Sequence, residues 1–161
     1  MEDLAARLVS PDADVRLQSA KHVWQHPTIA QLVVVPLVRA TGHDDESSRF
    51  AEAALECIGA PQCEDAGALA ELLHDDSPRV ASWAATLLGR LGEASAPMAT
   101  NLGAVIANGA EMHVKQQAAW ALSQMGPAAE SATDALNEAT ESGNLRLARI
   151  ARRALRRIKA A

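Results

Sequence analysis

The stretches Val80-Ala-Ser-Trp-Ala-Ala-Thr-Leu-Leu88 and Val114-Lys-Gln-Gln-Ala-Ala-Trp-Ala-Leu122 are two versions of one nine-residue pattern, and this pattern decides the fold. Both close on leucine, with a further apolar residue three positions later and a glycine directly after it. Three weaker copies close on Val23, Leu55 and Leu155, so the five closing residues are spaced by 32, 33, 34 and 33 positions. Five copies at a near-constant period indicate a repeat architecture.

Each copy predicts a pair of helices. Val80, Ala84 and Leu87 recur at helical spacing, which predicts a buried stripe along the second helix of the pair. Ala84 and Ala118 lie in the middle of such stripes, so we expect them at close contacts between helices. Because one helix pair cannot bury its apolar face alone, we expect ten helices stacked in one row. The first helices are predicted over residues 4–9, 29–38, 66–73, 98–106 and 132–139.

Punctuating residues mark the ends of the second helices. Ser77-Pro78 has the form of a helix cap followed by proline in the first turn, and Ser10-Pro11 is a second candidate for that role. Gly59, Gly92 and Gly126 are predicted to end their helices, because glycine is the usual residue just after a helix.

The composition supports an all-α domain. The chain has 161 residues, of which 48% are apolar and 22% charged, so disorder throughout is not expected. Three Trp, one Phe and no Tyr argue against a β-sandwich or barrel. No apolar run is long enough to cross a membrane and no secretory leader is visible, which predicts a soluble, cytoplasmic protein. We predict one domain over residues 1–161, with repeats at approximately 1–26, 27–60, 61–92, 93–126 and 127–161.

The repeats share two further elements, a turn acid before a Val-Arg pair or its equivalent and an alanine-rich ending that closes on glycine. The turn acids and their partners are Asp12…Val15-Arg16, Asp76…Arg79-Val80 and Glu111…Val114-Lys115. With these elements the chain resembles HEAT repeats, in particular the short HEAT-like class of phycobilisome-lyase-type proteins. The resemblance implies a right-handed α-solenoid of about five helix pairs, with the second helices lining a concave face.

That implied face defines the candidate binding residues. They occupy outward positions of the second helices: Arg49, Arg79, His113, Gln116, Trp120, Gln124, Arg146, Arg149 and Arg153. Trp120 stands where the other repeats have Lys21, Ala53, Thr86 and Arg153. An exposed tryptophan would anchor a partner side chain. The alternative is that the ring packs between helices, and the sequence leaves both open.

Charge is distributed unevenly along the chain. Residues 1–141 hold all 20 acidic residues and 8 of the 15 basic ones, whereas residues 142–161 hold seven basic residues and no acid. A basic last helix has two interpretations. It could bind an acidic peptide, phosphate or nucleic acid. It could equally be a polar cap that keeps the last repeat soluble.

The remaining aromatic residues are assigned structural roles. Phe50 and Trp83 occupy equivalent positions at the edge of the buried stripe, which predicts core packing. Trp24 ends the first of the second helices and is predicted to shield the N-terminal end of the stack. His22 and His26 have the i, i+4 spacing of a metal pair, but no third ligand is evident, so a packed His22 is the preferred interpretation.

No motif for catalysis or cofactor binding is present. Cys57 and Cys63 lack a metal-ligand pattern and are predicted to be reduced thiols. Iron-dependent HEAT enzymes carry His-Glu dipeptides, and this sequence has none. We therefore expect a non-catalytic scaffold without cofactors that binds a protein or peptide, with a monomer favoured. The alternatives are nucleic-acid binding through the basic C-terminal helix, which the acidic body disfavours, and an accessory role similar to that of phycobilin lyase HEAT-like subunits.

Overall fold

The computed structural model describes residues 2–160, and all of its regular structure is helical. Contacts divide the chain into two compact units, Met1–Asp65 and Ala66–Ala161. Both are built from antiparallel helix pairs, so the predicted all-α helical-repeat fold is confirmed. The assignment of residues 1–161 to one domain stays a prediction.

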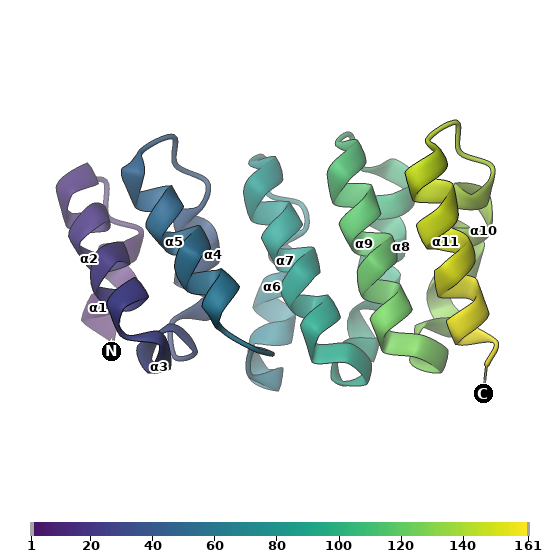
Figure 1. Cartoon of the computed structure of the whole chain (residues 1–161), viewed down its shortest axis with the longest axis horizontal. Helices are drawn as coiled ribbons and strands as arrows, with labels where there is room; N and C mark the ends of the chain where they lie inside the picture. The colour runs from purple at the N-terminus through teal and green to yellow at the C-terminus, as the bar shows by residue number, and fades with distance from the viewer. Residues whose placement is uncertain (1, 161) are drawn as a thin grey trace. The chain divides into compact units, whose positions relative to one another are not determined.

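The first unit contains two layers of helices. Helices α2 and α5 form one layer, and α1 and α4 lie behind them (Figure 1). Leu8, Val23, Leu37 and Leu55 are fully buried between the layers. The helices of this unit are α1 (Glu2–Leu8), α2 (Ala13–Gln25), α3 (Pro27–Ala30), α4 (Val34–Ala40) and α5 (Glu46–Cys57), followed by the 3-10 turn Cys63–Asp65.

The prediction of one helix over residues 29–38 is wrong, because the structure breaks it into α3 and α4 at residues 31–33. The physical reason is Pro36. Inside a longer helix its ring would clash with the carbonyl of residue 32, and it has no N–H to donate. The break places Pro36 in the first turn of α4, where no N–H is needed.

The second unit repeats one helix pair three times. Helices α7, α9 and α11 form one layer, and α6, α8 and α10 form the other (Figure 1). We call the first of these the second-helix layer. The helices are α6 (Ala66–Leu72), α7 (Pro78–Leu91), α8 (Ala99–Asn108), α9 (Met112–Met125), α10 (Thr133–Thr140) and α11 (Leu145–Ile158). The 3-10 segments Gly92–Met98 and Gly126–Ala132 lead from one pair to the next.

Two of the three predicted glycine ends are confirmed in conformation. Gly92 and Gly126 directly follow α7 and α9 with φ values of 58° and 62°, a region that side-chain-bearing residues rarely adopt. Gly59 differs, since α5 already ends at Cys57 and Ile58 is extended. The chain there leaves the helix without a left-handed residue.

Of the two predicted serine caps, one is at the N-cap position and the other is not. Ser77 occupies the N-cap position of α7 with Pro78 in the first turn, as predicted, but its hydroxyl makes no capping hydrogen bond. Ser10 does not cap α2. Asp12 does so, because its carboxylate accepts hydrogen bonds from the backbone N–H groups of Asp14 and Val15.

Small residues set the packing of the second-helix layer. Ala84 and Ala118 are fully buried, which confirms their predicted place at helix contacts. Helix α9 packs along α7 on one side and along α11 on the other. Outward residues of these three helices therefore lie on neighbouring rows of one surface.

Candidate partner-binding face

We define the second-helix face as the outward surface of α7, α9 and α11 in the second unit. Of the predicted binding residues it carries Arg79, His113, Gln116, Trp120, Gln124, Arg146, Arg149 and Arg153. Arg49 is exposed on α5 in the first unit and is described apart from them.

Trp120 is half-buried, with its ring seated on the backbone of α7. A Cβ atom added to Gly89 would lie 2.4 Å from Cζ3 and 2.9 Å from Cε3 of the ring. The ring edge thus occupies the space that a side chain at residue 89 would fill. The two alternatives for Trp120 combine here, because one edge packs between helices while part of the ring stays accessible.

A methyl group at residue 89 should displace this ring. In Gly89→Ala the ring has to leave its seat, so we expect red-shifted tryptophan emission. The free energy of unfolding should fall by about 1–3 kcal/mol, because the overpacking outweighs alanine's better helix propensity. The same Gly89→Ala substitution made in a Trp120→Phe variant should give no such shift, which assigns the change in emission to Trp120. An emission spectrum unchanged by Gly89→Ala would contradict the seat.

The two glutamines make contacts within the chain. The side-chain amide of Gln116 donates to Oδ1 of Asn144 at 3.2 Å, and the same oxygen accepts the backbone N–H of Leu147 at 3.0 Å. Asn144 is the N-cap of α11, so Gln116 connects α9 to the start of the next second helix. Gln124 donates to the hydroxyl of Ser123 at 3.3 Å. Gln116 therefore uses one of its side-chain hydrogen bonds to connect two helices of the face.

The arginines of α11 are oriented towards solvent. Arg146, Arg149 and Arg153 are exposed, and none has an ion pair or hydrogen bond from its guanidinium within residues 2–160. Arg152 differs, because its guanidinium donates to the carbonyl of Thr140 in α10 at 3.0 Å. The helix thus has an open basic side and a side turned towards its own pair.

Two of the predicted residues lie at the beginnings of helices. His113 is exposed in the first turn of α9. Arg79 is half-buried in the first turn of α7 and interacts within the chain. Neither residue is an open cation of the kind seen along α11.

Charge separates by layer in the second unit, a feature that the linear charge count did not show. Helices α7, α9 and α11 contain no aspartate or glutamate. The acidic residues of the unit lie in first helices, 3-10 segments and turns: Glu71, Asp75, Asp76, Glu93, Glu111, Glu130, Asp134, Glu138 and Glu141. All basic residues of this unit except Lys159 lie in α7, α9 and α11, whereas its acidic residues lie outside these three helices. The second-helix layer thus carries no acidic residue, and its basic residues are concentrated in α11.

Aromatic residues of the first unit form a small cluster on α2 and α5. Trp24 is 44% exposed and meets the ring of Phe50 edge-on, with ring centres 5.4 Å apart. The ammonium of Lys21 lies 5.0 Å from the centre of the Phe50 ring. Trp24 was predicted to shield the N-terminal end, but it packs towards α5, the following repeat.

Phe50 and Trp83 are half-buried rather than core residues. Each carries a cation beside its ring, Lys21 at Phe50 and Arg90 at 5.8 Å from the centre of Trp83. Their helix positions face the margin between core and solvent, where a cation can lie beside each ring.

The prediction of a packed His22 is wrong. His22 is exposed, and its ring lies 4.7 Å from that of His26. The side chain precedes the fully buried Val23 but projects away from the core. No group of three or more His, Cys, Asp or Glu side chains within residues 2–160 could hold a metal ion. Cys57 and Cys63 are exposed and are not joined by a disulfide.

Comparisons with known proteins agree with this architecture. Among curated protein sequences, none matches the chain. An engineered protein superposes with a TM-score of 0.61 at 19% identity, over 98% of this chain and 78% of the other. The complex of CpcE and CpcF of phycocyanin lyase from Nostoc sp. PCC7120 gives 0.64 at 22% identity, over 99% and 65%. A designed armadillo repeat protein in complex with the peptide (KR)4 gives 0.61 at 17% identity, over 95% and 79%.

At these identities the solved structures show a shared helical-repeat fold, and the chain spans about two thirds of the lyase chain. No helix within residues 2–160 is both long and apolar enough to cross a bilayer. The family model for HEAT repeats matches residues 66–156, from the start of α6 almost to the end of α11. Because that match covers more than half of the sequence and coincides with the three stacked helix pairs, the chain belongs to the HEAT-repeat family.

Proposed function

We propose that the second unit is a non-catalytic binding module that holds an acidic protein or peptide segment along its second-helix face. The observation that carries this proposal is the absence of acidic residues from α7, α9 and α11. An acidic segment on this face meets no like charge from the helices beneath it. The exposed Arg149 and Arg153 supply positive charge one turn apart on α11.

Trp120 supplies the apolar part of the proposed site. Because Gly89 seats one edge of the ring, its orientation is set before a partner arrives. A pre-oriented aromatic ring loses little side-chain entropy on binding, which is why tryptophan is frequent among residues that dominate binding energy. The proposed partner therefore carries an apolar side chain close to its carboxylates.

Two of the fold-related structures are complexes, which supports a binding role. A fold-related designed protein was solved in complex with a peptide, and the CpcE–CpcF structure is a complex of two chains. The peptide (KR)4 is basic, so the sign of the partner proposed here comes from this chain's own arginines. Helical-repeat arrays of this kind offer extended surfaces for such segments.

A labelled peptide of sequence (Asp-Leu-Glu)4 tests the proposal by fluorescence anisotropy, with (Asn-Leu-Gln)4 as the neutral probe. The double variant Arg149→Glu/Arg153→Glu should weaken binding of the acidic peptide by about tenfold or more. The matched control is Arg152→Glu/Arg156→Glu, which changes the net charge by the same amount in the same helix. It should weaken binding by less than about threefold, because Arg152 turns towards α10.

Equal losses in the two double variants would show attraction to net charge alone and contradict a defined face. Binding of the neutral peptide as tight as that of the acidic one would also contradict it. A short DNA duplex serves as the rival probe at physiological salt. If the duplex binds more tightly than the acidic peptide, the face is a nucleic-acid surface and the proposed partner is wrong.

A further inference from the structure

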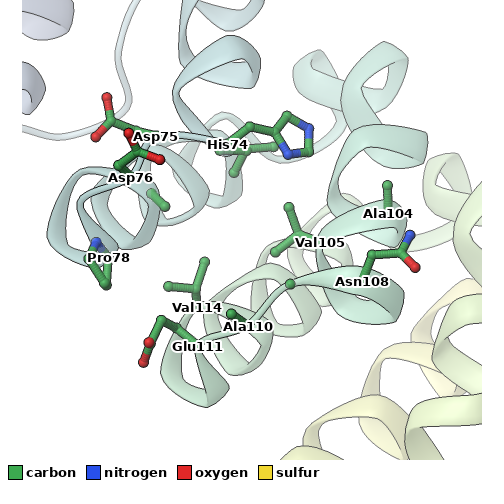
Figure 2. Close-up of a pocket in the computed structure, with 13 residues that line it drawn as sticks. His74, Asp75, Asp76, Pro78, Ala104, Val105, Asn108, Ala110, Glu111 and Val114 are labelled. Atoms are coloured by element: carbon green, nitrogen blue, oxygen red, sulfur yellow. The ribbon is translucent and has the colours of Figure 1, made fainter.

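A separate hollow lies at the edge of the second unit, where the turns lead into α7 and α9. A cavity of about 380 Å³ opens between the α6–α7 turn and the α8–α9 turn of the second unit (Figure 2). Its apolar lining includes Leu73 of the α6–α7 turn and Ala81, Val105 and Val114 of the helices, all of which are buried. The cavity is therefore a hollow with a packed apolar floor.

The rim of the cavity is acidic. Asp75, Asp76 and Glu111 line it, and no lysine or arginine does. Asp75 is used by the fold, because its Oδ1 accepts the backbone N–H of Ser77 at 2.9 Å. Asp76 and Glu111 are exposed, and no side-chain hydrogen bond or ion pair occupies their carboxylates in the part of the chain that the structure describes. Two carboxylates thus stand open beside an apolar floor.

The shape and lining restrict what can fill the hollow. A metal ion is disfavoured, because no three ligating side chains come together in residues 2–160. Its volume is at the lower end of the roughly 300–1,000 Å³ typical of ligand pockets, which suits a single long side chain better than a large cofactor. An organic cation on an aliphatic stem fits the hollow, because its methylene groups can pack on the apolar floor while its charge lies at the acidic rim.

We propose that this turn-edge pocket receives a lysine or arginine side chain from a partner peptide. The stem would lie over Val105 and Val114, and the cationic head would lie at the rim that carries Asp76 and Glu111. The charge of the occupant is opposite to that proposed for the second-helix face. The residues proposed to bind the cation, Asp76 and Glu111, are not among those proposed to bind the acidic segment, so the two proposals can fail independently.

A peptide with a single cationic side chain, acetyl-Gly-Ser-Gly-Arg-Gly-Ser-Gly-amide, tests this pocket. The matched probe replaces arginine by citrulline, which keeps the stem and removes the charge. In a titration followed by ¹⁵N–¹H NMR, the arginine peptide should shift backbone signals of residues 73–81 and 105–114. The citrulline peptide should bind at least about fivefold more weakly, because it loses the attraction between its head group and the acidic rim.

Isosteric variants locate the charge on the protein. Asp76→Asn/Glu111→Gln should weaken arginine-peptide binding about fivefold and leave binding of the acidic peptide (Asp-Leu-Glu)4 unchanged. The control Glu93→Gln/Glu130→Gln removes the same charge from exposed positions in the 3-10 segments and should have little effect. The inference is overturned if citrulline binds equally well, if the control matches the test variant, or if no signal in the two segments shifts at millimolar peptide.

Discussion

Replacing Leu122 with alanine should lower the free energy of unfolding of the second unit by about 3–5 kcal/mol. Leu122 is fully buried in α9, the middle helix of the second-helix layer, with α7 and α11 packed on either side. The substitution leaves a cavity in the core, and the neighbouring helices cannot move in to fill it because they also pack against other helices. The loss combines the missing apolar burial with the cavity left behind. Urea unfolding followed by far-ultraviolet circular dichroism measures it.

The chain offers the same substitution at a position with no core contact. Leu145 is 85% exposed at the start of α11. Leu145→Ala should change stability by less than about 0.5 kcal/mol. Similar losses at both positions would contradict the assignment of Leu122 to the buried stripe, and with it the repeat pattern from which that stripe was predicted.

The second large effect is expected at Arg16 in the first unit. Its guanidinium donates to the carbonyls of Ser10 and Pro11 at 2.6 and 2.9 Å and pairs with Asp45 at 2.5 Å. Arg16 is buried, and its guanidinium connects the α1–α2 turn to the residue that caps the start of α5. Arg16→Ala should cost about 3 kcal/mol, because it leaves these acceptors without their donor.

The cost of Arg16→Ala should depend on pH. Burial raises the pKa of Asp45, but hydrogen bonds from Ser47 and Arg16 outweigh it and lower the pKa to about 2 from 3.8. A carboxyl whose pKa is lowered by folding stabilises the protein above its unfolded pKa. This contribution is lost as the pH falls from about 4 to 2. The stability gap between the wild-type chain and Arg16→Ala should therefore narrow over that range.

Arg39→Ala is the matched control, since Arg39 is exposed on α4 of the same unit. It should alter stability by less than about 0.5 kcal/mol at any pH in the series. A gap for Arg16→Ala that stays constant between pH 4 and pH 2 would show that the Arg16–Asp45 pair does not carry the effect.

The helix pairs could be predicted because their signals are local. The stripe of Val80, Ala84 and Leu87 and the glycine after α7 depend only on residues within four positions of one another. The break between α3 and α4 could also have been found, since Pro36 alone forbids a longer helix. The burial of His22 was mispredicted because it adjoins a core position, and one residue along a helix turns a side chain by about 100°.

The candidate site could be predicted only in part from such local signals. Arg149 and Arg153 were placed on an outward row by helical periodicity together with the resemblance to HEAT repeats, and they are exposed. The seat of Trp120 depends on Gly89, which is 31 positions earlier in the sequence. A glycine inside a helix opposite a tryptophan in the next repeat was the available signal. Interpreting it required knowing how closely α7 and α9 approach.

The sequence by itself determined the helical repeats, their period and the basic character of the last helix, because these follow from short-range periodicity and composition. Only the tertiary structure decided that Trp120 lies half-covered on Gly89, that Gln116 is bound to Asn144, and that an acidic hollow opens between two turns. Each of these features joins residues from different repeats. Their geometry is set by the distance between neighbouring helices, which depends on the packing of all the small residues between them.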